Sequence, residues 1–327
     1  MLPSFDYIRP DNLKAAVKQL SSEGAAVHGG GTDLLGCLRD RIFDVSKLVS
    51  ISRIQDLKGI RETADGGLRI GALTTITDIA DHPVIQERFS VLAQAAAEVA
   101  SPQLRNQGTI GGNICQKPRC WYYRGDFDCL RKGGDRCFAP MGENQFHCIL
   151  GSDSICFIVH PSDPAPALVA LNAKAEIQGP KGKRSLALEE FHMPPGVDVT
   201  RETYLNPGEI VTEIVIPPAP QGLRSAYRKV RTRRAWDFAI AGTAIALQFD
   251  GDTVTNGRVV LSGAAPVPWR SQPVEKRIIG KKLDEELIAE AAEASMEGAM
   301  PLKKNDYKIA LFKAVVFEEL TKIAGNP

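Results

Sequence analysis

The sequence predicts an α+β protein built from two or three domains. A chain of 327 residues is longer than one typical domain. Segments with helical spacing of apolar residues are interspersed with short strand-like segments. A segment rich in proline and glycine, 217–224, precedes a final part of about 100 residues that has its own strands and helices.

The N-terminal half gives the first elements. Residues 11–23 carry apolar residues at helical spacing, and residues 25–40 read as a strand, a glycine turn and a helix that starts near Thr32 or Asp33. Strands are expected at 47–52 and 67–71. Helices are expected at 73–81, with Thr77 as the candidate N-cap, and at 91–100, and residues 105–114 form a glycine turn.

The C-terminal half continues the mixture. A helix and then a strand are expected over 165–179, and residues 209–217 alternate with period two, which is typical of a strand. Beyond the segment 217–224 the sequence predicts three strands and two helices, the second helix capped by Asn305. The expected ranges are 224–233, 240–249, 257–263, 283–299 and 305–324.

Composition excludes several classes of protein. Hydrophobic content is 43%, charged content is 24% and the formal net charge is +1, so neither a nucleic acid nor a membrane surface is expected as a partner. The first residues contain proline and acidic residues in place of an apolar export signal, and no apolar run approaches the ~18 residues of a membrane span. The cytoplasm is the expected compartment.

Two glycine turns are candidate ligand sites. Residues 27–35 (VHGGGTDLL) place three glycines between a strand and a helix, and residues 108–113 (GTIGGN) form the second turn. Glycines let a backbone approach an anion, and two such turns could clamp a diphosphate. Gly36 is followed by Cys37, not by the lysine of a P-loop, and no dinucleotide fingerprint is present. The alternative is that each of the two glycine turns has only a structural role.

Six of the seven cysteines lie between positions 115 and 156. The odd count and the absence of an export signal disfavour a disulfide framework, and no pair has the spacing of a zinc knuckle. Four cysteines suit a [4Fe–4S] cluster, and nearby basic residues would offset its negative charge. The alternatives are unpaired buried cysteines and a zinc-stabilised assembly protein. Spacing does not choose four ligands among Cys115, Cys120, Cys129, Cys137, Cys148 and Cys156.

Three histidines near these motifs are expected to play lesser roles. His28 lies beside the first glycine turn, where it could contact a cofactor, but a catalytic base is not expected there. His147 and His160 are expected to be solvated or hydrogen-bonded loop residues.

Several motifs together carry a family resemblance over the whole chain. They are FDYIRPDNLKAA, VHGGGTDLL, IGALTTITDIA, SPQLRNQGTIGGNI, HPSDPAPALVAL and SAYRKVRTRRAWDFAIAG. The chain resembles the FAD-binding medium subunit of molybdenum hydroxylases of the xanthine dehydrogenase family. It is similar to the versions with an inserted [4Fe–4S] loop, as in bacterial aldehyde oxidoreductase and 4-hydroxybenzoyl-CoA reductase.

The resemblance implies a fold and a flavin site. The fold is a two-subdomain FAD-binding fold of the vanillyl-alcohol-oxidase type followed by a C-terminal α+β domain. The implied ranges are 1–57, 58–220 with an iron–sulfur loop at 115–160, and 221–327. The implied FAD contacts are Val27, His28, Gly29, Gly30, Gly31, Thr32, Asp33, Leu34, Thr109, Ile110, Gly111, Gly112, Asn113, Asp163, Val211 and Lys229.

The resemblance also implies the cluster ligands and the role of the chain. The ligands would be Cys120, Cys129, Cys137 and Cys156, which leaves Cys115 and Cys148 outside the set. Electrons would pass between a small [2Fe–2S] partner and an external carrier such as ferredoxin, while a large molybdenum-cofactor partner would bind the substrate. A self-contained flavin oxidoreductase of the same fold is the alternative, and the sequence does not identify the substrate.

Overall fold

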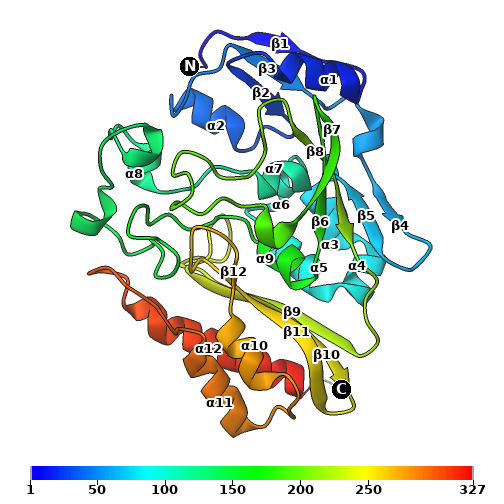
Figure 1. Ribbon diagram of the computed structural model, residues 1–327, viewed down its shortest axis with the longest axis vertical. Coiled ribbons are helices and arrows are strands. Elements are labelled where there is room, and N and C mark those ends of the chain that lie inside the picture. Colours follow the sequence, from blue (N-terminus) through cyan, green and yellow to red (C-terminus); the bar gives the residue numbers. More distant parts are fainter. Residues whose placement is uncertain (1, 326–327) are drawn as a thin grey trace.

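The computed structural model describes residues 2–325, and within that range the strands form three sheets (Figure 1). The first sheet is parallel, with the strand order β1-β3-β2. Helix α1 lies within the predicted range 11–23 and begins after Asn12, whose side chain accepts a hydrogen bond from the Ala15 N–H at 2.9 Å. The elements are β1 (Asp6–Ile8), α1 (Leu13–Leu20), β2 (Ala25–His28), α2 (Leu34–Arg39), β3 (Lys47–Ser50) and the 3₁₀ turn η1 (Gln55–Leu57).

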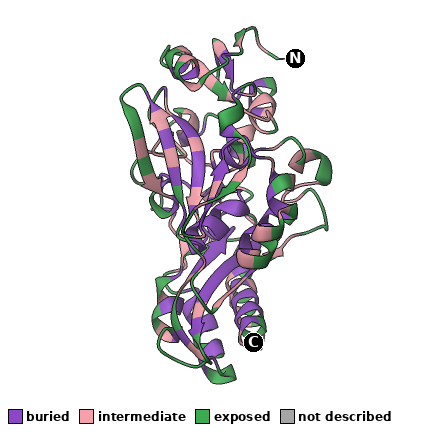
Figure 2. Ribbon diagram, turned by 90° about the vertical axis from the view of Figure 1, so that its right-hand side faces the viewer, coloured by how far each residue is buried: buried purple, intermediate pink, exposed green. Residues whose placement is uncertain are grey.

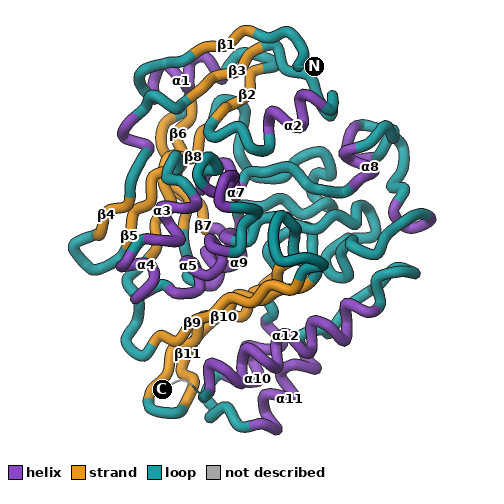
Figure 3. The backbone as a smooth tube through the Cα atoms, turned by 180° about the vertical axis from the view of Figure 1, so that it is seen from behind, coloured by secondary structure: helices purple, strands orange, loops and turns teal. Residues whose placement is uncertain are grey.

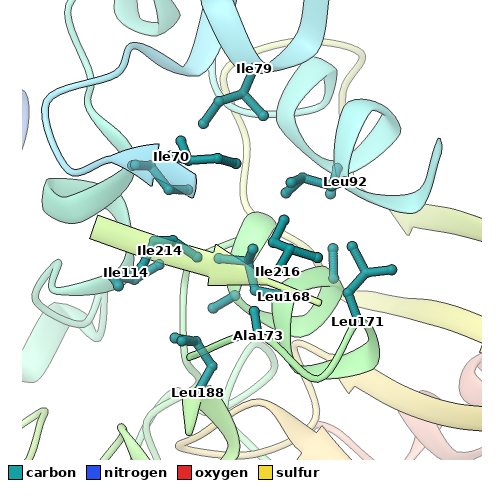
Figure 4. Packing of buried hydrophobic residues seen from close by; sticks show 14 of the residues in the cluster. Ile70, Ile79, Leu92, Ile114, Leu168, Leu171, Ala173, Leu188, Ile214 and Ile216 are labelled. Carbon is teal, nitrogen blue, oxygen red and sulfur yellow. The ribbon is translucent and has the colours of Figure 1, made fainter. Parts of the chain in front are cut away.

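The second sheet is antiparallel, with the strand order β4-β5-β8-β6-β7. Its core forms where isoleucines of the strands meet apolar residues of the helices; Figure 4 shows Ile70 and Ile214 among the side chains of this cluster. The strands are β4 (Ile60–Glu62), β5 (Leu68–Gly71), β6 (Lys174–Gly179), β7 (Gly182–Ala187) and β8 (Ile210–Ile216). The helices are α3 (Ile76–Asp81), α4 (Pro83–Arg88), α5 (Ser90–Ala97), α6 (Pro102–Arg105), α7 (Ile110–Ile114), α9 (Pro164–Ala170) and η4 (Leu188–Glu190).

This part differs from the sequence prediction in several details, and β4, α4 and β7 were not predicted. The N-cap of α3 is Thr75 and not Thr77, because the Thr75 hydroxyl accepts from the Asp78 N–H while the Asp78 carboxylate accepts from the Thr75 N–H. The predicted glycine turn at 105–114 begins at the last residue of the short helix α6 and ends in the short helix α7. Both are too short to leave a clear periodic pattern in the sequence.

The cysteine-rich segment is irregular, as predicted. Between α7 and α9 it contains α8 (Trp121–Arg124) and the 3₁₀ turns η2 (Leu130–Lys132) and η3 (Ala139–Met141). Figure 1 shows it as green loops on one side of the molecule, between α2 and the C-terminal helices, and the view from behind shows the same arrangement (Figure 3).

The third sheet is antiparallel, with the strand order β12-β11-β10-β9, and three helices follow it. Buried residues run along its strands and along α12 (Figure 2). Asn305 is not the cap of α12, because Asp306 takes that position and the Asn305 side chain turns toward residues 147 and 148. The elements are β9 (Leu223–Val230), β10 (Ala241–Asp250), β11 (Thr253–Ser262), β12 (Trp269–Arg270), α10 (Gln272–Ile278), α11 (Glu285–Ala294) and α12 (Tyr307–Ala324).

Among the described residues, no helix combines the length and the apolar character needed to cross a membrane.

Candidate functional site

The first glycine turn joins β2 to α2 and lies directly against the second. A Cβ atom at Gly30 would lie 1.9 Å from the Gln107 carbonyl oxygen, and Gly31 has φ +74°, so both positions require glycine. Within residues 2–325 the N–H groups of residues 30–33 donate to no backbone carbonyl. These free donors form a cradle that can bind an anion such as a diphosphate.

The second turn is the start of α7. The Thr109 hydroxyl accepts from the Gly112 N–H at 3.2 Å, and the Gly111 N–H donates to the Ala72 carbonyl at 2.9 Å. Asn113 follows, and its side-chain oxygen accepts a hydrogen bond from the Ser162 hydroxyl. The turn is therefore fixed both to the second sheet and to the segment that leads into α9.

Two chambers open on either side of these turns. They share Thr32, Asp33, Thr109, Gly112 and Gln116, so together they form one groove that passes over both turns. The chambers hold about 1030 and 910 Å³ of open space, which includes space open to solvent.

The two chambers differ at their far ends. Asp163, Asn113 and Phe238 line the first, which we call the Asp163 chamber. Val211, Leu73 and Phe43 line the second, which we call the Val211 chamber.

Asp163 belongs to a buried polar cluster. Its carboxylate accepts from Lys229 Nζ at 2.7 Å and from the Tyr227 hydroxyl at 2.7 Å. Tyr227 and Lys229 are two residues apart on β9 and therefore point to the same face of the sheet. Burial raises the pKa of Asp163 above its usual value, while Lys229 opposes that shift.

Most of the predicted flavin contacts line the groove. The exceptions are His28, Ile110 and Lys229, which line neither chamber. Ile110 is a core residue, and Lys229 reaches the site through Asp163. Burial lowers the pKa of His28, whose Nε2 faces Gly31. The groove residues are Val27, Gly29, Gly30, Gly31, Thr32, Asp33, Leu34, Thr109, Gly111, Gly112, Asn113, Asp163 and Val211.

Asp33 connects the first glycine turn to the cysteine-rich segment. Its carboxylate accepts from the Lys117 N–H at 2.8 Å and from Arg124 Nη2 at 2.8 Å, and it also pairs with Arg119. Burial alone would raise the pKa of Asp33, but the two arginines outweigh burial and lower it. Sequence reasoning missed this role, because a residue placed at a helix start was expected to cap the helix or contact a ligand.

Four cysteines surround one small cavity in the cysteine-rich segment. The lining cysteines are Cys120, Cys129, Cys137 and Cys156, the set that the resemblance implied. Cys115 lines the Val211 chamber instead, and Cys148 is fully buried beside Phe157.

The four thiols that line this cavity are free; Cys129 and Cys156 are buried, and Cys120 and Cys137 are half-buried. All seven cysteines are unpaired, and within residues 2–325 no group of three or more His, Cys, Asp or Glu side chains is placed to hold one metal ion. Burial raises the pKa of Cys120 to about 12 and also raises the pKa of Cys156.

Comparisons with known proteins match both parts of the chain. Residues 3–219 match the family of the FAD binding domain in molybdopterin dehydrogenase, and residues 225–323 match the CO dehydrogenase flavoprotein C-terminal domain. The chain is 35% identical to the FAD-binding subunit PaoB of aldehyde oxidoreductase from Escherichia coli K12, with 98% of each chain covered. It is 31% identical to the carbon monoxide dehydrogenase medium chain of Hydrogenophaga pseudoflava, with 94% of this chain and 93% of that one covered.

A solved structure of a related protein supports the same assignment. Carbon monoxide dehydrogenase from Hydrogenophaga pseudoflava aligns with a TM-score of 0.77 at 28% identity, over 97% of this chain and 96% of that one. The family match, the relatives and the fold agree over nearly the whole length. The chain therefore belongs to the FAD-binding subunits of the molybdenum hydroxylases and is an oxidoreductase subunit with the α+β flavin fold and C-terminal domain of that family.

Proposed function

We propose that the chain transfers electrons through two cofactors, FAD in the groove over the glycine turns and a [4Fe–4S] cluster held by Cys120, Cys129, Cys137 and Cys156. The observation that carries the proposal is that these four cysteines, and neither Cys115 nor Cys148, line one cavity. Asp33 ties this cavity to the flavin groove, because it binds Arg119, the residue before Cys120.

The groove fits FAD by the chemistry of its lining. The free N–H groups of residues 30–33 can receive the diphosphate, and the chambers on either side can receive the two ring systems. When bound, FAD converts between two-electron and one-electron chemistry, and the residues of the groove position it and tune its electrostatics.

The cysteine cavity offers the ligands of a four-iron cluster. Four cysteine thiolates are the usual ligands of a [4Fe–4S] cube, and four cysteines line this cavity. Aromatic and aliphatic side chains form much of the remaining wall and limit the access of water. They are Tyr122, Tyr123, Leu130, Phe138, Phe157 and Ile158.

Partner subunits complete the proposed electron path. Several relatives are named as the medium chain or the FAD-binding subunit of a larger enzyme, which supports a role as one component of a complex. We propose that a large molybdenum-cofactor subunit carries the substrate site and that a small [2Fe–2S] subunit exchanges electrons with the flavin. An external carrier such as ferredoxin would exchange electrons at the [4Fe–4S] end.

Single serine substitutions test the ligand set. Each of C120S, C129S, C137S and C156S is expected to lose most of the iron of the anaerobically purified chain, because the cube loses a thiolate. C115S and C148S are the matched controls and are expected to keep the iron content of the wild type. Retention of iron in the first four variants, or its loss in C148S, would contradict the proposed ligand set.

Expression of the chain with and without its partners tests the proposed role. The chain alone is expected to bind FAD and yet to turn over neither aldehydes nor purines. Robust turnover of either substrate class by the chain alone would favour a self-contained flavin oxidoreductase. Purification with zinc and without flavin would contradict both functions.

A further inference from the structure

Two side chains with nitrogen donors, Arg131 and His147, join the wall of the cysteine cavity. Both are buried, with exposed fractions of 5% for each residue. Apart from the cysteines and two tyrosines, the rest of the lining is apolar.

Arg131 has one nitrogen without a partner. Its Nη2 donates to Glu202 Oε1 at 2.9 Å and to the Arg201 carbonyl at 2.8 Å, and its Nε donates to the same carboxylate at 3.2 Å. Its Nη1 is buried and has no hydrogen-bond acceptor among the described residues. A buried donor without an acceptor costs free energy. An acceptor inside the cavity would remove this cost for the Nη1 group.

His147 contacts a cavity cysteine directly. Its Nε2 lies 3.3 Å from Cys120 Sγ, and its Nδ1 is buried without a partner among residues 2–325. Its backbone carbonyl accepts from Lys308 Nζ at 3.0 Å and from Asn305 Nδ2 at 3.0 Å. Lys308 of α12 and Asn305, just before this helix, therefore hold the backbone at His147.

The other basic residues of the cysteine-rich segment do not line the cavity and make contacts elsewhere. Arg119 and Arg124 bind Asp33, Lys117 pairs with Glu202, and Lys132 donates to the Gly125 carbonyl at 2.8 Å. The Arg136 side chain is 72% exposed. Arg131, which is paired with Glu202, is therefore the basic residue of this segment that lines the cavity.

We propose that Arg131 and His147 donate hydrogen bonds to the sulfur atoms of the cluster and thereby raise its reduction potential. The inference rests on the proposed function, because it requires the cluster. A cluster with four thiolates is anionic and becomes more negative on reduction, so a buried cation and N–H donors stabilise the reduced state more than the oxidised state. Hydrogen bonds to sulfur and local charge are among the features that set such potentials.

A redox titration of the full-length chain tests the proposal. Anaerobically purified R131M is titrated with dithionite while the paramagnetic signal of the reduced cluster is recorded by electron paramagnetic resonance. The ratio of reduced to oxidised cluster at the wild-type midpoint is expected to fall at least tenfold, which is a midpoint lower by about 59 mV for one electron. H147F is expected to lower the midpoint by a smaller amount.

R136M is the matched control, since it removes an exposed charge next to Cys137. Its midpoint is expected to equal that of the wild type, because solvent screens that charge. If R131M fails to hold the cluster, R131K and H147F carry the test. R131K keeps the charge and loses the planar fork, so its midpoint is expected to lie below that of the wild type.

The outcomes separate the inference from the proposed function. A wild-type chain without iron and sulfide would overturn the cluster itself. A wild-type chain with a normal cluster, together with R131M, R131K and H147F variants whose midpoints match it, would overturn the roles of Arg131 and His147 while leaving the ligand set intact.

Discussion

Gly30 shows how a single residue position shapes the flavin groove. The two glycine turns touch at this point, where an added Cβ would lie 1.9 Å from the Gln107 carbonyl. The obstacle is backbone, so no side-chain rotation can relieve it. Gly30 thus brings the cradle of residues 30–33 against the segment that leads into the second turn.

We expect G30A to lose FAD. The extra methyl group forces the two turns apart and displaces the N–H groups that face the groove. The ratio of flavin to protein after purification, read from the absorbance spectrum, is expected to fall at least tenfold. The control is G325A, where the nearest atom to an added Cβ lies 3.5 Å away, and its flavin content is expected to stay at the wild-type level. A fully flavinated G30A chain would contradict this account of the turn.

Helix α12 acts as an element that holds the cysteine-rich segment from the C-terminal side. Lys308, on its first turn, is fully buried and donates to the carbonyls of His147 at 3.0 Å and Gly263 at 2.8 Å. Burial lowers the pKa of Lys308 to about 8. One side chain thus connects the helix, the loop after β11 and the wall of the cysteine cavity.

We expect K308M to destabilise the chain. Methionine keeps much of the volume but leaves the buried Gly263 carbonyl without this donor and the His147 carbonyl with Asn305 alone, which costs about 1–3 kcal/mol. The free energy of unfolding in urea measures this loss. K313M is the control, because Lys313 lies on the same helix at the surface and pairs with Glu293; its effect is expected to stay within about 0.5 kcal/mol. Equal stability of the two variants would show that the carbonyls find other donors.

The sequence predicts the existence of helices and strands better than it predicts the residues at which they begin and end. The long periodic segments, such as the helix within 305–324 and the strand within 209–217, form as expected because burial of one face produces a regular pattern. The cap of α3 was assigned two residues late and that of α12 one residue early, since several adjacent polar residues compete for each position. Strands β1, β4, β7 and β12 were not predicted. Strands β1, β4 and β12 have three residues or fewer, and β7 has no buried residue and carries no alternation of apolar and polar residues.

At the scale of the whole molecule, the site depends on contacts between distant segments. The glycine turns could be recognised in the sequence because the residues that matter are adjacent there. Arg131 and Glu202 could not be paired in this way, because 71 residues separate them and neither side chain carries a periodic signal. The family resemblance selected the four cavity cysteines, whereas their spacing alone did not.

Two buried histidines lie where three parts of the molecule meet. His192 Nε2 lies 3.0 Å from the Ile114 carbonyl at the end of α7, and its ring packs against that of His160, with the ring centres 4.1 Å apart. The backbone N–H of His160 donates to the carbonyl of Ala265, in the loop after β11. Burial lowers the pKa of His192 from 6.5 to about 4 and lowers the pKa of His160 as well.

We therefore expect the stability of the chain to fall as the pH falls from about 6.5 to about 4. In this range the unfolded chain binds a proton at His192 that the folded chain does not, so protonation favours unfolding. The shift corresponds to about 3 kcal/mol for His192. H192Q keeps an N–H donor but does not titrate, so its urea midpoint is expected to vary less than that of the wild type over this range. A comparison of the two proteins at pH 8, where His192 is neutral in both states, measures the structural cost of the substitution alone. An equally steep dependence of the urea midpoint on pH in H192Q would show that other groups control the acid sensitivity.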